Sequence, residues 1–63
     1  MHLKAEINLD NNSFQNGGTN ELKRAINESL EELRGQWPNV NGARSKVRDC
    51  NGNIVGTITI LDD

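Results

Sequence analysis

The chain has 63 residues, a net charge of −2 and a single cysteine. This length allows one domain, residues 1–63, near the lower size limit for folding without a disulfide, a metal or self-association. Cys50 has no second cysteine to pair with and His2 is the only histidine, which excludes an internal disulfide and a zinc site of Cys and His ligands. The near-neutral charge supports neither a strongly basic nucleic-acid binder nor an acidic mimic of DNA.

The first part of the chain predicts a strand followed by a loop. Residues 3–9 alternate between apolar and polar side chains, which is the period of a strand with one buried face. Residues 10–18 are rich in Asn, Asp, Ser and Gly and predict a loop, with Phe14 folded back onto the core. The apolar side of the strand consists of Leu3, Ala5, Ile7 and Leu9.

The next segment predicts the only helix. Thr19 or Asn20 is the expected N-cap, and Glu21 in the first turn would complement the helix dipole. Gly35 is expected to end the helix in a left-handed conformation, with Arg34 in the last turn. The apolar residues at helical spacing form one stripe that we expect to face the core: Leu22, Ala25, Ile26, Leu30 and Leu33.

The last third predicts a hairpin of residues 44–50 and 53–61. Asn51-Gly52 favours a two-residue type I′ turn. A type I turn that begins at Asp49, with Gly52 as the bulge, is the alternative and would shift the register. Gly56 lies where the helix or a neighbouring side chain can approach closely. The two-residue turn is favoured because it places Val47 on one face with Ile54, Ile58 and Ile60.

These elements predict an α+β domain of order β-α-β-β, a three-stranded sheet with one helix packed on one face. The hairpin strands are antiparallel to each other. The place of the first strand in the sheet stays open, although a right-handed crossover would set it parallel to a hairpin strand.

The residues that carry chemistry do not form a catalytic or metal-binding pattern. Cys50 has no histidine near it in sequence, and the adjacent Glu31 and Glu32 do not face one another on a helix. Residues 10–13 lack the spacing of a calcium loop, and Gly17-Gly18 is only a fragment of a phosphate-binding loop. We therefore expect a protein that is not an enzyme and uses no cofactor or metal.

Two charged surfaces and one tryptophan are the candidate binding features. Trp37 is expected in the core over the end of the helix, and an exposed interface anchor is the alternative. A basic strand face of Arg44, Lys46 and Arg48 would bind anions, or would serve only to protect a sheet edge from aggregation. The expected partner-binding surface is the acidic helix face together with the end of the chain, and an ordinary solvated face is its alternative: Glu21, Glu28, Glu31, Glu32, Asp62 and Asp63.

Two segments resemble short uncharacterised proteins of bacteriophages and prophages. Residues 4–14, KAEINLDNNSF, resemble their Lys-x-Glu-Ile start with an Asp-Asn pair and a Phe, and residues 48–56, RDCNGNIVG, resemble their closing Arg-Asp-x-Asn-Gly-Asn-x-Val-Gly hairpin. The resemblance implies a phage origin. Proteins of this size and origin include anti-CRISPR proteins and other inhibitors that bind a host complex stoichiometrically.

The sequence thus leads to one main expectation and two alternatives. The main one is a phage-encoded, non-enzymatic accessory protein in the bacterial cytoplasm that binds and inhibits a host protein or defence complex, with an anti-CRISPR-like inhibitor as the most concrete version. The first alternative is a small nucleic-acid-binding module that uses the basic face. The second is a structural or regulatory phage protein that works as a homodimer. No membrane association is expected, because no apolar run approaches the length of a span.

Overall fold

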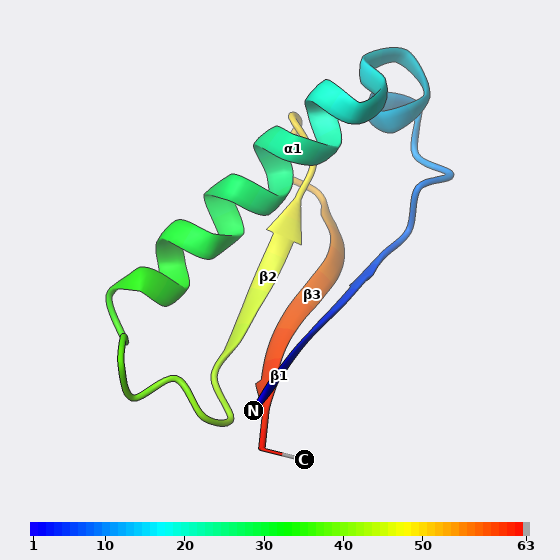
Figure 1. Ribbon diagram of the computed structural model, residues 1–63. Helices are drawn as coiled ribbons and strands as arrows, with labels where there is room; N and C mark the ends of the chain where they lie inside the picture. Colours follow the sequence, from blue (N-terminus) through cyan, green and yellow to red (C-terminus); the bar gives the residue numbers. More distant parts are fainter. Residues whose placement is uncertain (63) are drawn as a thin grey trace.

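The computed structural model describes residues 1–62 and shows the predicted α+β architecture (Figure 1). The elements are β1 (His2–Ile7), α1 (Asn12–Arg34), β2 (Arg44–Arg48) and β3 (Ile54–Leu61). The three strands form one sheet, and α1 packs on one of its faces. The molecule is elongated, with principal extents of 35 × 21 × 17 Å.

The sheet has β3 at its centre and β1 and β2 at its edges. Both edge strands are antiparallel to β3. β1 therefore runs in the same direction as β2 but does not adjoin it, because β3 lies between them. The parallel pairing considered for the first strand does not form, and the hydrogen-bonded neighbour of β1 is antiparallel.

The hairpin uses the longer of the two turns considered above. The Gly52 N–H donates to the Asp49 carbonyl at 3.0 Å, and Gly52 has a φ of 85°. No other residue of this turn has a positive φ. This excludes the type I′ turn, because both central residues of that turn have a positive φ. The predicted two-residue turn is wrong: the turn begins at Asp49 and the register shifts between Val47 and Arg48. Ile54 consequently pairs with Arg48 and is 55% exposed instead of joining the buried face.

The helix begins earlier than the sequence suggested. The Asn11 side chain caps it by accepting a 2.7 Å hydrogen bond from the Ser13 N–H, so the loop predicted up to residue 18 is wrong from residue 12 onward. Gly18, with φ 57° and ψ −138°, interrupts the helix just before the predicted N-cap at Thr19. Phe14 is buried as expected, although it belongs to the helix and not to a loop.

The helix ends at Arg34, close to the predicted end. Gly35 has a right-handed φ of −66°, so the left-handed cap expected there is wrong. The chain then turns back through a cis Trp37–Pro38 bond to the fully buried Val40.

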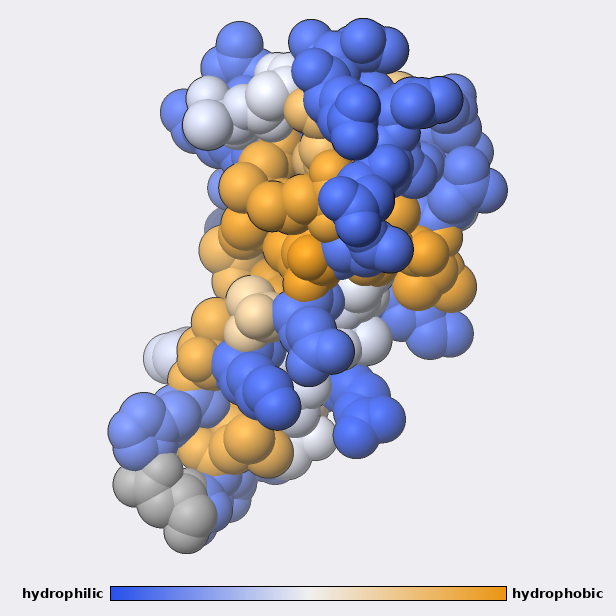
Figure 2. Space-filling model, turned by 90° about the vertical axis from the view of Figure 1, so that its right-hand side faces the viewer, coloured by the Kyte–Doolittle hydropathy of each residue, from blue (hydrophilic) through white to orange (hydrophobic). Residues whose placement is uncertain are grey.

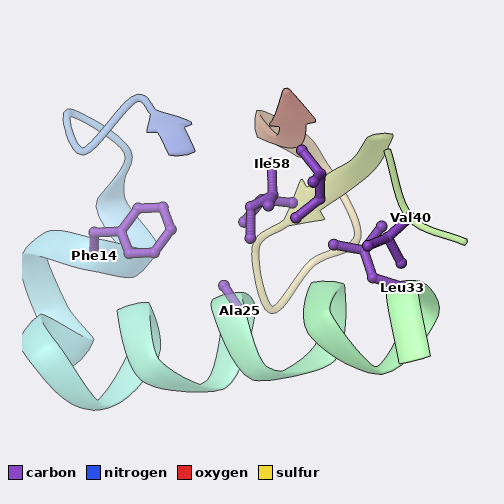
Figure 3. Packing of buried hydrophobic residues seen from close by; sticks show 7 residues of the cluster. Phe14, Ala25, Leu33, Val40 and Ile58 are labelled. Atoms are coloured by element: carbon purple, nitrogen blue, oxygen red, sulfur yellow. The ribbon is translucent and has the colours of Figure 1, made fainter. Parts of the chain in front are cut away.

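The core follows the inner face of α1, with Phe14 toward one end and Leu33 beside Val40 toward the other (Figure 3). The single apolar stripe predicted for the helix is divided in two. Ala25 and Leu33 are buried, whereas Leu30 is 39% exposed, and Leu22 and Ile26 are only partly buried. The buried apolar residues of the described chain are Phe14, Ala25, Leu33, Val40, Val47, Ile58 and Ile60.

Candidate functional site

The helix covers only part of the sheet, and this determines where a binding site lies. Among the strands, α1 contacts chiefly β2, at an edge of the sheet (Figure 1). The small residues Ala25 and Ser29 lie in the buried line of the helix, and the Ser29 hydroxyl donates to that of Ser45 in β2 at 2.7 Å. Because these side chains are small, the backbones of α1 and β2 can approach each other closely, and α1 packs at the β2 edge of the sheet. The β1 half of the same sheet face is left uncovered.

The uncovered half presents apolar side chains from two elements. In β1, Leu3 pairs with Ile60 and Ala5 with Ile58, so these four residues share the helix-side face. Leu3 is nevertheless 52% exposed, because α1 packs chiefly on β2 and not on β1. On the helix, Leu22, Ile26 and Leu30 recur at every fourth residue and are partly exposed. They lie beside the row of buried helix residues that includes Ala25 and Ser29. We name this surface the apolar groove and define it by Leu3, Ala5, Leu9, Leu22, Ile26, Leu30 and Trp37.

The apolar groove has a hollow at each end. One hollow, of about 230 Å³, is lined by Leu9, Phe14 and Leu22 together with Gln15, Gly18 and Thr19. The other, of about 320 Å³, is lined by Leu3, Leu30, Leu33, Arg34, Trp37 and Ile60. Seen from the β1 side, hydrophobic surface gathers over the middle of the molecule, with hydrophilic residues around it (Figure 2).

Trp37 belongs to this site and not to the core. Its side chain is 65% exposed and lines the larger hollow beside Leu3 and Leu30. The core position that we predicted for it is wrong, because Val40, three residues later, fills the space next to Leu33. The indole is exposed in its loop, and its role as an interface anchor stays a prediction.

Glu21, predicted at the exposed start of the helix, is a buried structural residue. Its side chain is 8% exposed, and its carboxylate accepts hydrogen bonds from Arg24 Nε at 2.6 Å and from the Cys50 N–H at 2.8 Å. The bond from Arg24 lowers the pKa of Glu21 against the opposing effect of burial, and the Cys50 N–H lowers it further. Glu21 therefore fastens the hairpin turn to α1 and is not offered to a partner.

The other helix carboxylates are exposed and paired with arginines of the same chain. Glu28 pairs with Arg24 at 2.5 Å, Glu31 with Arg34 at 3.3 Å, and Glu32 with Arg48 at 3.6 Å. Asp62 follows the end of β3, and Asp63 lies outside the described residues. Of the six acidic residues predicted to bind a partner, Glu28, Glu31 and Glu32 lie together on the solvent-exposed side of α1. Each of the three is next to an arginine.

Arg44 and Lys46 alternate with the buried Ser45 and Val47 and lie on the sheet face opposite to the helix, whereas Arg48 follows the register shift and pairs with Glu32 of α1 at 3.6 Å. Arg44, Lys46 and Arg48 are all exposed, and Arg44 pairs with Thr59. Thr59 also pairs with Lys4 of β1, so Lys4 and Arg44 flank it on the same face. The sequence showed that Lys4 points away from the core. It did not show that Lys4 joins the basic strand, because this depends on β1 lying next to β3.

The hairpin turn is held by a second buried carboxylate. Burial by itself would raise the pKa of Asp49, but hydrogen bonds from Asn53, Asn11 and Asn51 outweigh that effect and lower it. The neighbouring Cys50 is exposed, with its Sγ 3.3 Å from Ser13 Oγ. This region is therefore built to fix the turn against the start of α1, and the turn-prone sequence from Asp49 to Asn53 is the signal that predicts it.

Further comparisons give no additional site. Among residues 1–62, no three His, Cys, Asp or Glu side chains are grouped in a way that could hold a metal ion. No helix in the same range is long and apolar enough to cross a membrane. Comparisons with protein-family models, with curated proteins and with solved structures found no match for this chain.

Proposed function

We propose that this protein acts by binding another protein through the apolar groove and performs no chemistry itself. The observation that carries the proposal is the exposure of Leu3, Leu30 and Trp37 around one hollow, on a sheet face that the helix leaves uncovered. Contiguous apolar surface with a polar rim is typical of an interaction site, and an exposed tryptophan is a frequent source of binding energy. The acidic helix surface is the weaker candidate, because its carboxylates already have partners in the chain.

The resemblance to small phage proteins suggests what the partner is. Under this proposal the partner is a bacterial host protein or defence complex, and the protein inhibits it by occupying a surface, as an anti-CRISPR protein would. Stoichiometric binding needs no catalytic residue, which suits a chain of this composition.

Affinity capture with matched variants tests the proposal. Tagged protein is incubated with bacterial lysate, and retained proteins are identified by mass spectrometry. We expect Leu30→Ser with Trp37→Ala to reduce the specific partner at least tenfold, since both side chains line the groove. Glu28→Gln is the matched control on the acidic surface and should retain the partner, because Glu28 pairs with Arg24 and not with a residue of the groove. A partner that is kept by the groove variant and lost by the acidic variant would move the binding site to the helix carboxylates.

A nucleic-acid-binding function is the second candidate, and the position of Lys4 favours it. Lys4, Arg44 and Lys46 form a cationic face around Thr57 and Thr59 in which only Glu6 is acidic. Such a face would contact phosphates, and it has no aromatic side chain for stacking on bases. If it binds nucleic acid, low-salt electrophoresis should show retardation that declines steeply with added salt and is lost in Arg44→Glu with Lys46→Glu. No retardation at low salt would end this candidate.

A further inference from the structure

The vacant space over β1 has the width of one helix. α1 packs on β2, and β1 lies two strands away on the same sheet face. Two strand spacings amount to roughly 10 Å, and packed helices lie about 8–10 Å apart. A second helix over β1 would therefore contact the sheet below it and α1 beside it. It would cover Leu3, Leu30 and Trp37 together.

The two hollows also match the spacing of a helix. They are lined by Leu22 and Leu30, which are separated by two turns of α1, or about 12 Å along its axis. Large apolar side chains at positions i and i+7 or i+8 of an incoming helix have this separation. Volumes of about 230 and 320 Å³ lie at or below the small end of the range for small-molecule pockets, so the hollows suit single side chains better than a ligand.

The rim of the groove on the helix side is positively charged. Lys23 lies three residues before Ile26, and Arg34 lies four residues after Leu30, so both border the groove. Within the described chain Lys23 has no ion-pair partner, and the exposed Arg34–Glu31 pair is weak at 3.3 Å. The carboxylates Glu21, Glu28 and Glu32 lie on the opposite flank of α1, toward β2. The groove thus combines an apolar floor with a cationic rim.

We propose that the apolar groove binds an acidic amphipathic α-helix of the partner protein, an inference that rests on the proposed function. The apolar stripe of that helix places two large side chains in the hollows, and its flanking Glu or Asp residues face Lys23 and Arg34. A second copy of this chain fits less well. Its own α1 stripe is bordered by the same Lys23 and Arg34, so it does not supply the flanking carboxylates that would complement this rim.

Designed peptides and the single tryptophan of the chain provide the test. The probe is a tryptophan-free peptide of about four helical turns with Leu at i, i+3, i+7 and i+11 and Glu on both sides of the stripe. Binding of this peptide should bury the exposed indole of Trp37. The tryptophan fluorescence should then shift to shorter wavelength in a saturable titration. A peptide of the same composition in scrambled order should bind at least tenfold more weakly, because its leucines do not share one face.

Charge reversal separates the rim from the floor of the groove. Lys23→Glu with Arg34→Glu should weaken the Glu-flanked peptide about tenfold at low salt and strengthen a Lys-flanked version by a similar factor. Arg44→Glu with Lys46→Glu, on the other sheet face, is the matched control and should leave both affinities unchanged. Leu30→Ser should weaken both peptides alike, because it alters the floor and not the rim. Circular dichroism of each variant verifies that the fold persists.

Several results would overturn the inference. Equal binding of the ordered and scrambled peptides, or of the Glu- and Lys-flanked peptides, would contradict a charge-selective helix site. A concentration-dependent dimer in sedimentation that is lost in Leu30→Ser would assign the groove to a second copy. Trp37 burial by neutral lipid vesicles, without any by the peptides, would assign it to a membrane surface. If the peptides fail while the groove variant still loses its captured partner, the proposed function stands and only the helical occupant is wrong.

Discussion

The two flanks of α1 differ in the size and polarity of their side chains. Toward β2 the contact is small and polar: Ser29 and Ser45 hydrogen-bond at 2.7 Å, and Ser45 lies 2.8 Å from Glu32 Oε2. Toward β1 the side chains are large and apolar, and Leu30 remains 39% exposed. In its middle, the helix thus meets β2 through small side chains, although Phe14 and Leu33 nearer its ends are buried. An exposed Leu30 in a chain with so few large apolar residues is what distinguishes the β1 flank as a binding surface.

The same contrast applies to the strands. β2 is held by β3 and by the helix, whereas β1 is held mainly by its antiparallel pairing with β3. A strand fixed on one side only is expected to open more easily than its neighbours. Four predictions test this difference between the two halves of the molecule, from the largest expected effect to the smallest.

Truncation of apolar side chains should separate the two halves most clearly. Ile58→Ala removes a side chain that is 1% exposed and should cost about 2–5 kcal/mol of unfolding free energy. Leu3→Ala, on the same sheet face but uncovered, should cost less than about 1 kcal/mol. Urea denaturation followed by circular dichroism measures both. Equal costs would show that β1 is covered in solution, for instance by self-association.

A methyl group at Gly56 should weaken the attachment of β1. An added Cβ would lie 2.1 Å from the Glu6 carbonyl oxygen and 2.7 Å from Ile7 Cα, so the strand backbone, and not the helix, requires glycine here. We expect Gly56→Ala to cost about 1–3 kcal/mol. Amide hydrogen exchange should show faster exchange in β1 with less change in β2. Gly35→Ala, where a Cβ meets only a backbone oxygen at 3.9 Å, is the control.

Removal of the buried serine contact should test the β2 flank. Ser45→Ala leaves the Ser29 hydroxyl without its 2.7 Å acceptor and should cost about 1 kcal/mol. Ser29→Ala with Ser45→Ala should recover part of that loss, because no hydroxyl is then left unpaired. Thermal unfolding compares the three proteins. If the double variant lost more unfolding free energy than the two single variants together, this account would be contradicted.

Acid should loosen the hairpin turn on the same flank. The pKa values of Glu21 and Asp49 are lower in the folded chain than in the unfolded chain, where carboxyl groups titrate near about 4. Folding therefore favours their ionised forms: the stabilisation is complete above about pH 5 and is lost as the pH falls through the lower folded values. Glu21→Gln should reduce this acid sensitivity, because it removes one of the two carboxyl groups with a lowered pKa. Unfolding free energies between pH 2 and 6 measure the difference.

The local parts of the fold were predictable, and the global arrangement was not. The alternation of residues 3–9 identified the apolar side of β1, but nothing in it shows that α1 lies over β2 and leaves Leu3 exposed. The helical spacing found Leu22 and Leu30, yet the choice of Ala25 and Ser29 for the buried line depends on the close contact with β2. The Asn-rich segment suggested a loop, although Asn11 followed by Ser13 is also a capping signal.

The functional residues were foreseen only in part. The sequence indicates Trp37 as a candidate interface residue and identifies the charged residues by type. Their pairing was hidden, because an arginine such as Arg48 reaches Glu32 only after the hairpin has folded against the helix. The apolar groove was missed because it consists of residues that a sequence pattern assigns to the core.

The pairing of the outermost strand residues has a practical consequence for anything joined to this chain. His2 lies opposite Leu61, so β1 and β3 bring the two ends of the described chain side by side. The next pair, Leu3 and Ile60, lines the hollow that contains Trp37. A tag, a fluorescent label or a fused domain at either end would therefore emerge next to that hollow. A linker long enough to swing clear of it is the safer design for immobilisation, and a bulky fusion without a linker would serve as a cap that blocks the groove.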